Sequence, residues 1–445
     1  MPDTTQLDRI THLVVLMQEN RSFDHLLGFL YPGRRTPSGQ PFEGLTGTES
    51  VPGSDGAVTV FRIDPNTPDA YFMPGANPRE GYLPTNSQLF GDPSPPPPAA
   101  EPPMDGFVSS FADALRYDAQ KQEPIYPGTA PANIMGCFTP ETLPVLSGLA
   151  RGFAVCDHWY SSVPTMTLPN RAFALAGTSR GRMDDHQQHG IPPFDFPSIF
   201  GLLDQHDPDP VGWAVYSDGK QLTRNDFPDT VRADPRHFGT FADFAAAAAH
   251  GTLPQGFIFL EPSWSPSGNS QHPNYDVAAG EQLMLRVYTA LRNGPDWDST
   301  LLVLTYDEHG GCYDHVPPPS GAVPPDDAAG QFGFDFGRFG VRVPTVLVSP
   351  LIAPQTVFRA GGGTPLDHTS LLKTVEQRWG LAPLTRRDAA APGLGDVLTL
   401  DRPRTDDPLA GVTAPTSSGA NPAEGTTSHL DAVCDALSAQ AMAQA

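Results

Sequence analysis

Two apolar runs, rich in β-branched residues, dominate the pattern of hydrophobic and polar positions. They are residues 10–17 (Ile-Thr-His-Leu-Val-Val-Leu-Met) and 300–305 (Thr-Leu-Leu-Val-Leu-Thr). Nearly continuous runs of this kind are typical of strands that are buried on both faces of a parallel sheet. Shorter runs at 212–216, 256–260 and 343–349 predict further strands. We therefore expect one sheet, with the first two runs as its central strands.

Segments with helical spacing lie between these strands. They are residues 104–115, 141–149, 167–175, 238–249, 281–291 and 367–379. Gly380 follows the last of them, at a position where glycine commonly ends a helix. Alternating strands and helices favour an α/β fold, a three-layer α/β/α sandwich.

Two Pro/Gly-rich stretches interrupt this alternation. Residues 32–103 include four consecutive prolines at 95–98 and predict a loop-rich insertion, and residues 401–427 predict an extended linker. After the linker, Ser428 is placed to cap a final helix whose apolar residues recur at helical spacing, namely Leu430, Val433, Cys434 and Leu437. We expect a single domain over residues 1–400, with residues 401–445 forming the linker and a helix that packs back on it.

The charge balance restricts the classes of partner. The chain has 27 Lys and Arg against 50 Asp and Glu, a formal net charge of −23. Nucleic-acid binding depends on Lys and Arg that neutralise phosphates, so a nucleic-acid partner is excluded. The same balance argues against docking on anionic lipid through a basic patch. An anionic substrate would need local positive charge, such as a metal ion.

The cysteines and the N-terminus restrict the chemistry and the location. Cys137, Cys156, Cys312 and Cys434 are far apart and form no C-x-x-C pair, so they indicate neither a zinc knuckle nor a redox dithiol. The chain shows no recognisable signal peptide and no apolar run long enough for a membrane span. We expect a soluble protein, either cytoplasmic or exported by a route that needs no N-terminal signal.

Polar residues follow both central strands, at 18–25 and at 306–315. In open α/β sheets, ligands bind at the carboxyl ends of the strands. A third segment, 161–175, brings Thr167 to the first turn of an apolar helix, two residues before Pro169, whose fixed φ suits a helix start. Thr167 is either a helix N-cap or a nucleophile whose captured phosphoryl group would lie at the positive end of the helix dipole.

These three segments offer a set of oxygen ligands: Glu19, Asn20, Thr167, Asp307 and Glu308. Carboxylate, amide and hydroxyl oxygens suit a divalent cation, and a hydroxyl bound to such a cation loses its proton more readily. His272 and His368 lie in polar clusters and are candidates for proton transfer, with a purely structural role as the alternative for each.

Four blocks of the sequence resemble the signature motifs of one family. They are Glu19-Asn20-Arg21-Ser22-Phe23-Asp24-His25, Thr167-Leu168-Pro169-Asn170-Arg171, Asp307-Glu308-His309-Gly310-Gly311 with Asp314-His315, and Asp367-His368-Thr369-Ser370. In this order they are similar to the phosphoesterase family of bacterial phospholipases C, plant non-specific phospholipases C and related acid phosphatases. The first block is highly specific, and the resemblance runs from residue 10 to about 380.

The resemblance implies an alkaline-phosphatase-like fold and metal-assisted hydrolysis through a phosphothreonine. By motif position, Glu19, Asn20, Asp307 and Glu308 would bind the metal, and Thr167 would be both ligand and nucleophile. The other implied catalytic residues are His272, His368, Asn170 and Arg171, and the substrate-binding ones are Asp276, His309, Trp159 and Tyr275. The metal remains open among zinc, calcium, magnesium and manganese. In this interpretation, residues 1–400 are a single catalytic domain.

The predicted activity is that of a phospholipase C, which converts glycerophospholipids such as phosphatidylcholine into diacylglycerol and a phosphorylated headgroup. Transient contact with a membrane surface would accompany it, and the oligomeric state stays open. For choline, an aromatic cage would come from Trp159, Tyr160, Trp264 and Tyr275. The alternatives are an acid phosphatase that uses the same residues, and a non-catalytic protein that binds phosphate or lipid.

Two further features bear on the chemistry. No histidine lies in the stretch before Met104, where family members often place one, so the leaving-group chemistry or the substrate range is expected to differ. The Thr167 block also resembles the C-x-P-x-R motif of sulfatases. Threonine cannot become the formylglycine that those enzymes need, so sulfatase activity is disfavoured.

Overall fold

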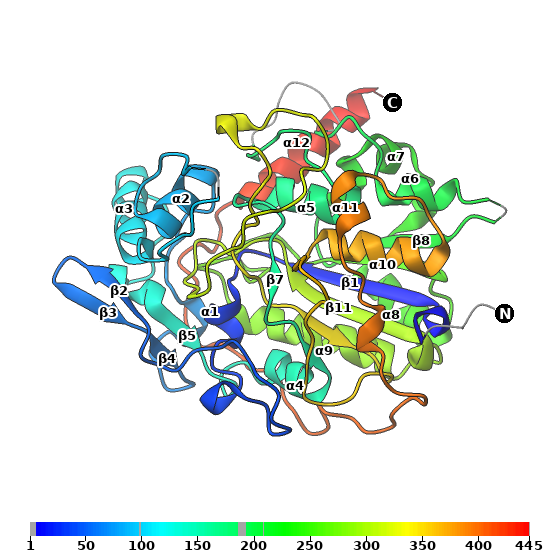
Figure 1. Ribbon diagram of the computed structural model, residues 1–445, viewed down its shortest axis with the longest axis horizontal. Coiled ribbons are helices and arrows are strands. Elements are labelled where there is room, and N and C mark those ends of the chain that lie inside the picture. Colours follow the sequence, from blue (N-terminus) through cyan, green and yellow to red (C-terminus); the bar gives the residue numbers. More distant parts are fainter. Residues whose placement is uncertain (1–5, 98, 186–192, 208, 445) are drawn as a thin grey trace.

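An eight-stranded mixed sheet forms the centre of the computed structural model, which describes residues 6–97, 99–185, 193–207 and 209–444 (Figure 1). Across the sheet, the strands follow the order β13 (Thr356–Val357), β6 (Ala154–Val155), β12 (Val346–Val348), β11 (Thr300–Tyr306), β1 (His12–Gln18), β10 (Gly256–Glu261), β8 (Gly212–Ser217) and β9 (Phe238–Thr240). Only β12 runs antiparallel to its neighbours among these paired strands. The five predicted strands are all present.

Helices cover both faces of the sheet, as Figure 1 shows. One layer contains α5 (Thr167–Ala176), α6 (Ile199–Asp204), α7 (Pro228–Arg232), α10 (Thr369–Trp379) and α11 (Arg386–Ala390). The opposite layer contains α4 (Pro144–Gly152), α8 (Phe241–His250) and α9 (Val277–Arg292). The predicted three-layer α/β/α sandwich is confirmed.

The two central strands explain where the site forms. Every residue of β1 and β11 is buried, so both faces of these strands contact the core. They run parallel with Gln18 opposite Tyr306, the last residues of the two strands. Glu19 and Asp307 therefore leave the sheet side by side, at the carboxyl edge where ligands bind in this class of fold.

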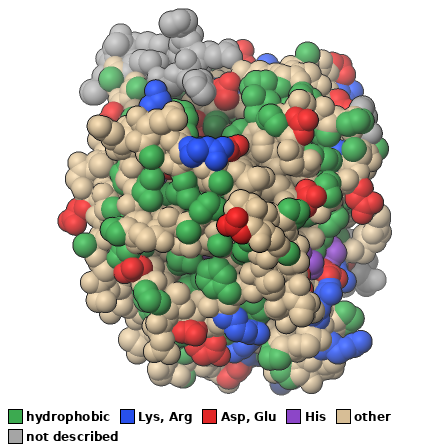
Figure 2. Space-filling view, turned by 90° about the vertical axis from the view of Figure 1, so that its left-hand side faces the viewer, with side chains coloured by type: hydrophobic (Ala, Val, Ile, Leu, Met, Phe, Trp, Pro, Cys, Tyr) green, Lys and Arg blue, Asp and Glu red, His purple; other side chains and the backbone are tan. Residues whose placement is uncertain are grey.

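Residues 32–138 form a lobe beside the sheet, at the left of Figure 1. Besides loops, it contains β2 (Ser50–Gly53), β3 (Gly56–Thr59), β4 (Phe61–Ile63), α2 (Tyr82–Phe90), α3 (Phe107–Lys121) and β5 (Gly136–Phe138). Its core includes Leu89, Phe107 and Phe111. On the face shown in Figure 2, acidic and basic side chains are interspersed among hydrophobic ones.

The helix predicted over residues 238–249 is wrong in its first turn. Residues 238–240 instead form the edge strand β9, which pairs with β8, and α8 begins at Phe241. Thr240 caps α8 by accepting the N–H of Asp243, whose carboxylate accepts the N–H of Thr240 in return. The predicted end of α10 is confirmed, because Gly380 adopts φ 71° at its C-terminus.

The C-terminal segment returns to the domain. Residues 401–427 contain neither helix nor strand and lead to α12 (His429–Gln444). The four apolar side chains predicted to face the domain are buried: Leu430, Val433, Cys434 and Leu437. The Ser428 hydroxyl accepts the N–H of Asp431 over 2.9 Å and so caps the helix. No helix in the described ranges has the length and apolarity to cross a membrane.

Candidate active site

Three segments that are distant in sequence meet at the carboxyl edge of the sheet. The main-chain N–H of Asn20, just after β1, donates to Asp307 Oδ1 over 2.9 Å. The Thr167 hydroxyl, at the start of α5, donates to Asn20 Oδ1 over 3.3 Å. Asn20 therefore lies between the carboxylate after β11 and the hydroxyl of α5, and three of the five predicted oxygen ligands meet here.

Arg171 holds α5 against the ends of the strands. Its Nε donates to Asp307 Oδ2 over 3.1 Å, and its Nη2 donates to the carbonyls of Met17 and Gln18 over 3.1 and 3.2 Å. The guanidinium also lies 4.6 Å from the ring centre of Trp264. These contacts are all buried, so Arg171 fixes the position of Thr167 one helical turn earlier.

Thr167 does not cap α5. The N-cap position belongs to Met166, and the Thr167 hydroxyl points to Asn20 instead. The N–H of Leu168 is taken by Asp185 Oδ1 over 2.8 Å. Asn170 fastens the loop before the helix, because its Nδ2 donates to the Thr165 carbonyl over 2.9 Å. The capping alternative is therefore wrong, and the hydroxyl is directed into the site.

A cavity of about 310 Å³ opens beside Thr167. Four predicted site residues line it, namely Glu19, Thr167, His272 and Tyr275. It is also lined by residues that sequence reasoning did not assign to the site, among them Asn77, Arg79, Glu80, Asp118, Asp185 and His429. These additions come from the lobe, from the loop after α5 and from the start of α12. The cavity thus lies where the sandwich, the lobe and the C-terminal segment meet.

Carboxyl groups are concentrated around this cavity. Burial raises the pKa of Glu19 to about 8, with the charge of Asp307 adding to the effect. Burial likewise raises the pKa of Glu308 well above its usual value and that of Glu80 to about 7. Glu308 Oε1 is buried and has no hydrogen-bond partner in the described part of the chain. Clustered, buried and partly unpartnered carboxylates are the environment that a divalent cation stabilises, so these residues fit a metal.

The two predicted histidines have different surroundings. His272 Nδ1 donates to the Pro273 carbonyl over 2.8 Å, and burial lowers the pKa of His272 to about 4. Its Nε2 is therefore the unprotonated nitrogen. His368 Nε2 donates to the Asp307 carbonyl over 2.6 Å, and its Nδ1 accepts the indole N–H of Trp159 over 3.3 Å. Both ring nitrogens of His368 are thus engaged, and the residue supports the Asp307 backbone.

The remaining predicted residues lie outside the cavity wall. Trp159, Tyr160 and Trp264 are buried in the core, so Tyr275 alone of the proposed aromatic cage lines the cavity. His309 Nε2 hydrogen-bonds Gln88 Oε1 over 2.7 Å behind Glu308. Asp276 caps α9 by accepting the N–H of Ala278 over 2.9 Å.

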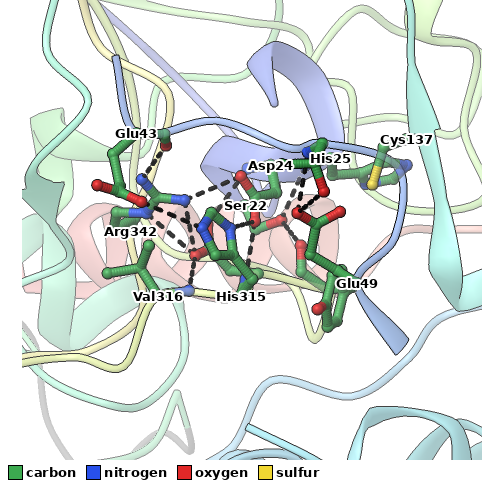
Figure 3. Close-up of polar contacts among 12 residues, drawn as sticks. Ser22, Asp24, His25, Glu43, Glu49, Cys137, His315, Val316 and Arg342 are labelled. Carbon is green, nitrogen blue, oxygen red and sulfur yellow. Dashed lines mark hydrogen bonds and ion pairs between the residues drawn. The ribbon is translucent and has the colours of Figure 1, made fainter. Parts of the chain in front are cut away.

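A second cluster of ionisable side chains joins the same two loops (Figure 3). Potential ligand atoms of Asp24, Asp314 and His315 lie within 4.8 Å of one another. Arg342 Nη2, however, lies 2.9 Å from a carboxylate oxygen of Asp24 and 2.9 Å from one of Asp314. The guanidinium already supplies the positive charge that a cation would bring. The cluster is therefore a buried ion-pair network that fastens α1 (Phe23–Leu27), which follows β1, to the loop after β11.

Known proteins match this chain over most of its length. The model of the Phosphoesterase family matches residues 10–382. Non-specific phospholipase C1 of Arabidopsis thaliana is 36% identical over 90% of this chain and 73% of its own length. Phospholipase C A of Mycobacterium tuberculosis is 29% identical over 92% of this chain and 82% of its own. A solved protein in the alkaline phosphatase superfamily from Vibrio parahaemolyticus overlaps 57% of this chain and 65% of its own, with 14% identity and a TM-score of 0.35.

The family match covers far more than half of the chain, and it includes Glu19, Thr167 and His272 of the cavity wall. The chain therefore belongs to the Phosphoesterase family, and it is a phosphoric ester hydrolase.

Proposed function

We propose that this hydrolase is a metal-dependent phospholipase C that acts on glycerophospholipids through a phosphothreonine intermediate. The observation that carries the proposal is the placement of the Thr167 hydroxyl, 3.3 Å from Asn20 Oδ1 and on the wall of a carboxylate-rich cavity. Relatives at 36% and 29% identity that are named phospholipases C support the substrate class.

Five residues would hold the divalent cation, whether zinc, calcium, magnesium or manganese: Glu19, Asn20, Thr167, Asp307 and Glu308. When bound, the cation would lower the pKa of the Thr167 hydroxyl and neutralise charge on a phosphoryl oxygen. Arg171 and His368 would keep Asp307 in place through its side chain and its carbonyl. Without a cation, burial favours the protonated forms of Glu19 and Glu308, and a bound cation would replace those protons.

The reaction would have two steps. In the first, the Thr167 oxygen bonds to phosphorus, its proton passes to His272 Nε2, and the bond from phosphorus to the diacylglycerol oxygen breaks as that oxygen takes a proton from a general acid. In the second, a water oxygen bonds to phosphorus and gives a proton back to that general acid, the bond to Thr167 breaks, and His272 returns its proton to the threonine oxygen. His272 suits this task because its Nδ1–H is held by Pro273, which leaves Nε2 as the basic nitrogen.

The charge of the cavity favours a diester over a monoester. Glu80 and Asp185 add carboxylates beyond those assigned to the cation. A phosphate monoester carries up to two negative charges, whereas a phosphodiester carries one, and phosphatidylcholine also brings a cationic headgroup. Repulsion from Asp185, and from Glu80 where the pH exceeds its pKa of about 7, therefore disfavours the acid phosphatase alternative. Tyr275, on the same wall, offers its ring to the headgroup.

Contact with a lipid surface would use exposed hydrophobic side chains. Leu83 on α2, Tyr117 on α3 and Phe332 on η8 (Gln331–Gly333) are 39%, 48% and 48% exposed. Tyr117 precedes Asp118, and Leu83 follows Glu80 closely, so both lie near residues of the cavity wall. We propose that these side chains touch the membrane transiently while a lipid headgroup enters the cavity.

One experiment separates the three candidate functions. Chelator-treated protein is assayed with p-nitrophenylphosphorylcholine and p-nitrophenyl phosphate, before and after addition of each of the four cations. The proposal predicts no turnover without a cation, recovery with at least one, and about tenfold or greater preference for the diester in kcat/KM. Preference for the monoester would identify an acid phosphatase. Vesicle binding without any turnover would identify a lipid-binding protein.

A further inference from the structure

The first residue of α12 belongs to the cavity wall. His429 lines the cavity together with Thr167, although it lies beyond the segment that the family model matches. Its Nε2 is 3.6 Å from Asp185 Oδ2. Asp185 Oδ1 in turn accepts the N–H of Leu168, the residue after Thr167, over 2.8 Å. A single carboxylate thus connects the imidazole to the helical turn that bears the nucleophile.

The position of His429 is fixed while its ring stays accessible. Ser428 caps α12 just before it, and Leu430 is buried directly after it. Farther along the helix, Asp435 pairs with Lys220 of the domain over 2.7 Å. The His429 side chain lines the cavity and is nevertheless 63% exposed. A leaving alcohol that extends out of the cavity would pass this ring.

The charges around His429 favour its protonated form. Asp185 is the main reason that the pKa of His429 is raised, and Glu80 and Glu19 act in the same direction. His272 and Arg79 are the basic groups on the cavity wall that face this acidic set. The two histidines predicted from sequence are different, because each has its ring N–H held by a carbonyl: Pro273 for His272 and Asp307 for His368.

We propose that His429 is the general acid that protonates the leaving alcohol. This inference rests on the proposed two-step mechanism. As the Thr167 oxygen bonds to phosphorus and the bond to diacylglycerol breaks, His429 Nδ1 gives its proton to the departing oxygen, while the Asp185 carboxylate, 3.6 Å from Nε2, favours the charged imidazole beforehand. In the second step, neutral His429 takes a proton from the water that attacks phosphorus. This step restores the protonated, positively charged form of His429.

The assignment accounts for a feature of the sequence. No histidine occurs between His25 and Met104, so the lobe offers no imidazole to this side of the cavity. In this chain the lobe instead contributes Glu80 to the cavity, and the C-terminal helix contributes an imidazole. The segment that follows residue 400 would therefore be part of the catalytic unit rather than an appendage to it.

The test compares two substrates that share phosphorylcholine and differ in the leaving group. Phosphatidylcholine in detergent micelles releases an alkoxide that needs a proton, whereas p-nitrophenylphosphorylcholine releases a phenolate that leaves without one. For His429→Gln under single-turnover conditions, we expect the rate of leaving-group release to fall about 100-fold with phosphatidylcholine, the scale of general acid catalysis, and less than about threefold with the nitrophenyl ester, because only the first step is measured. Ala432→Ser, at an exposed position on the same helix, should leave both rates unchanged.

The outcomes discriminate between roles. If the rate for His429→Gln fell by a similar factor with both substrates, His429 would bind phosphorylcholine or support the fold, and the proposal would be overturned. An unchanged rate with both substrates would overturn it as well. The acidic group that limits kcat for phosphatidylcholine at high pH should also be absent from the pH profile of His429→Gln. Wild-type protein that cleaves neither substrate with any cation would instead refute the proposed function itself.

Discussion

The main-chain N–H of Asn20 hydrogen-bonds the Asp307 carboxylate, and this contact requires a close approach between two loops. Asn20 adopts φ 58°, an uncommon conformation for a residue with a side chain. Gly310 lies against it with φ 62°, and a Cβ added there would be 2.1 Å from the Asn20 carbonyl oxygen. The D-E-H-G-G motif thus supplies both a carboxylate and the space that the opposing loop needs.

Gly310→Ala should therefore be more damaging than an ordinary glycine substitution. We expect a loss of about 2 kcal/mol or more in the free energy of unfolding, since the strained φ and the clash add together, and a weaker response to added cation. Gly411→Ala is the matched control, because Gly411 has φ 79° but open space around it, and should cost only about 1 kcal/mol. Urea unfolding of both variants measures the difference. Equal losses would show that the contact with Asn20 does not matter.

The substitutions His272→Gln and His368→Gln should have different effects, the first on activity and the second on stability. His272→Gln removes the basic Nε2 from the cavity, so we expect kcat to fall about 100-fold with little change in Tm. His368→Gln disturbs the buried partners of Trp159 and Asp307, so we expect a loss of about 1–3 kcal/mol in stability. Thermal unfolding and a p-nitrophenylphosphorylcholine assay on both variants would check this. Loss of activity without loss of stability in His368→Gln would contradict the structural role.

The ion-pair network of Figure 3 should be important for stability. Arg342→Met leaves the buried carboxylates of Asp24 and Asp314 without their cation, and we expect a cost of about 3–5 kcal/mol. Arg116→Met is the control, since its pair with Asp113 is mostly exposed, and should cost less than about 1 kcal/mol. Chemical denaturation gives both values. If divalent cations restored the stability of Arg342→Met, the cluster would have to be reinterpreted as a metal site.

Removal of the cation should make stability depend on pH. The pKa of Glu19 is raised to about 8 in the folded protein, against an ordinary value of 4.5. The metal-free fold therefore keeps a proton that the unfolded chain loses, and its free energy of unfolding should decrease as the pH rises from about 5 to 8. A cation that replaces this proton should raise Tm more at pH 8 than at pH 5.5. Thermal scans with chelator or cation test this, and Glu19→Gln should weaken the pH dependence.

A cation-induced change in Tm of the same size at both pH values would contradict that account. It would indicate that the ion binds at groups that do not compete with protons in this range.

Much of the fold follows from local sequence signals. β1 and β11 are predictable because both faces of each strand are buried, which makes the apolar runs nearly continuous. The convergence of Glu19 with Asp307 then follows from parallel pairing. The first turn predicted for residues 238–240 failed because an edge strand of three residues is too short to show a period, and its pairing with β8 is a long-range contact.

The additional cavity residues could not be found in the same way. Glu80, Asp185 and His429 lie on the lobe, on a loop and at the start of α12, and no periodicity connects them. The one sequence feature that bears on them is an absence: no histidine occurs in the stretch before Met104. Conversely, the motif that includes His368 does not reveal that both of its ring nitrogens are engaged, because its partners Trp159 and Asp307 come from distant segments.

The central claim is that Thr167 carries the phosphoryl group during turnover, and acid quenching tests it most directly. Protein with cation is mixed with phosphatidylcholine, stopped in acid within one turnover and analysed by peptide mass spectrometry. We expect phosphorylation at Thr167 in the wild-type protein. In Thr167→Ala we expect no phosphopeptide and a kcat that is lower by at least about 1,000-fold. Phosphorylation at another residue, or unchanged turnover in Thr167→Ala, would contradict it.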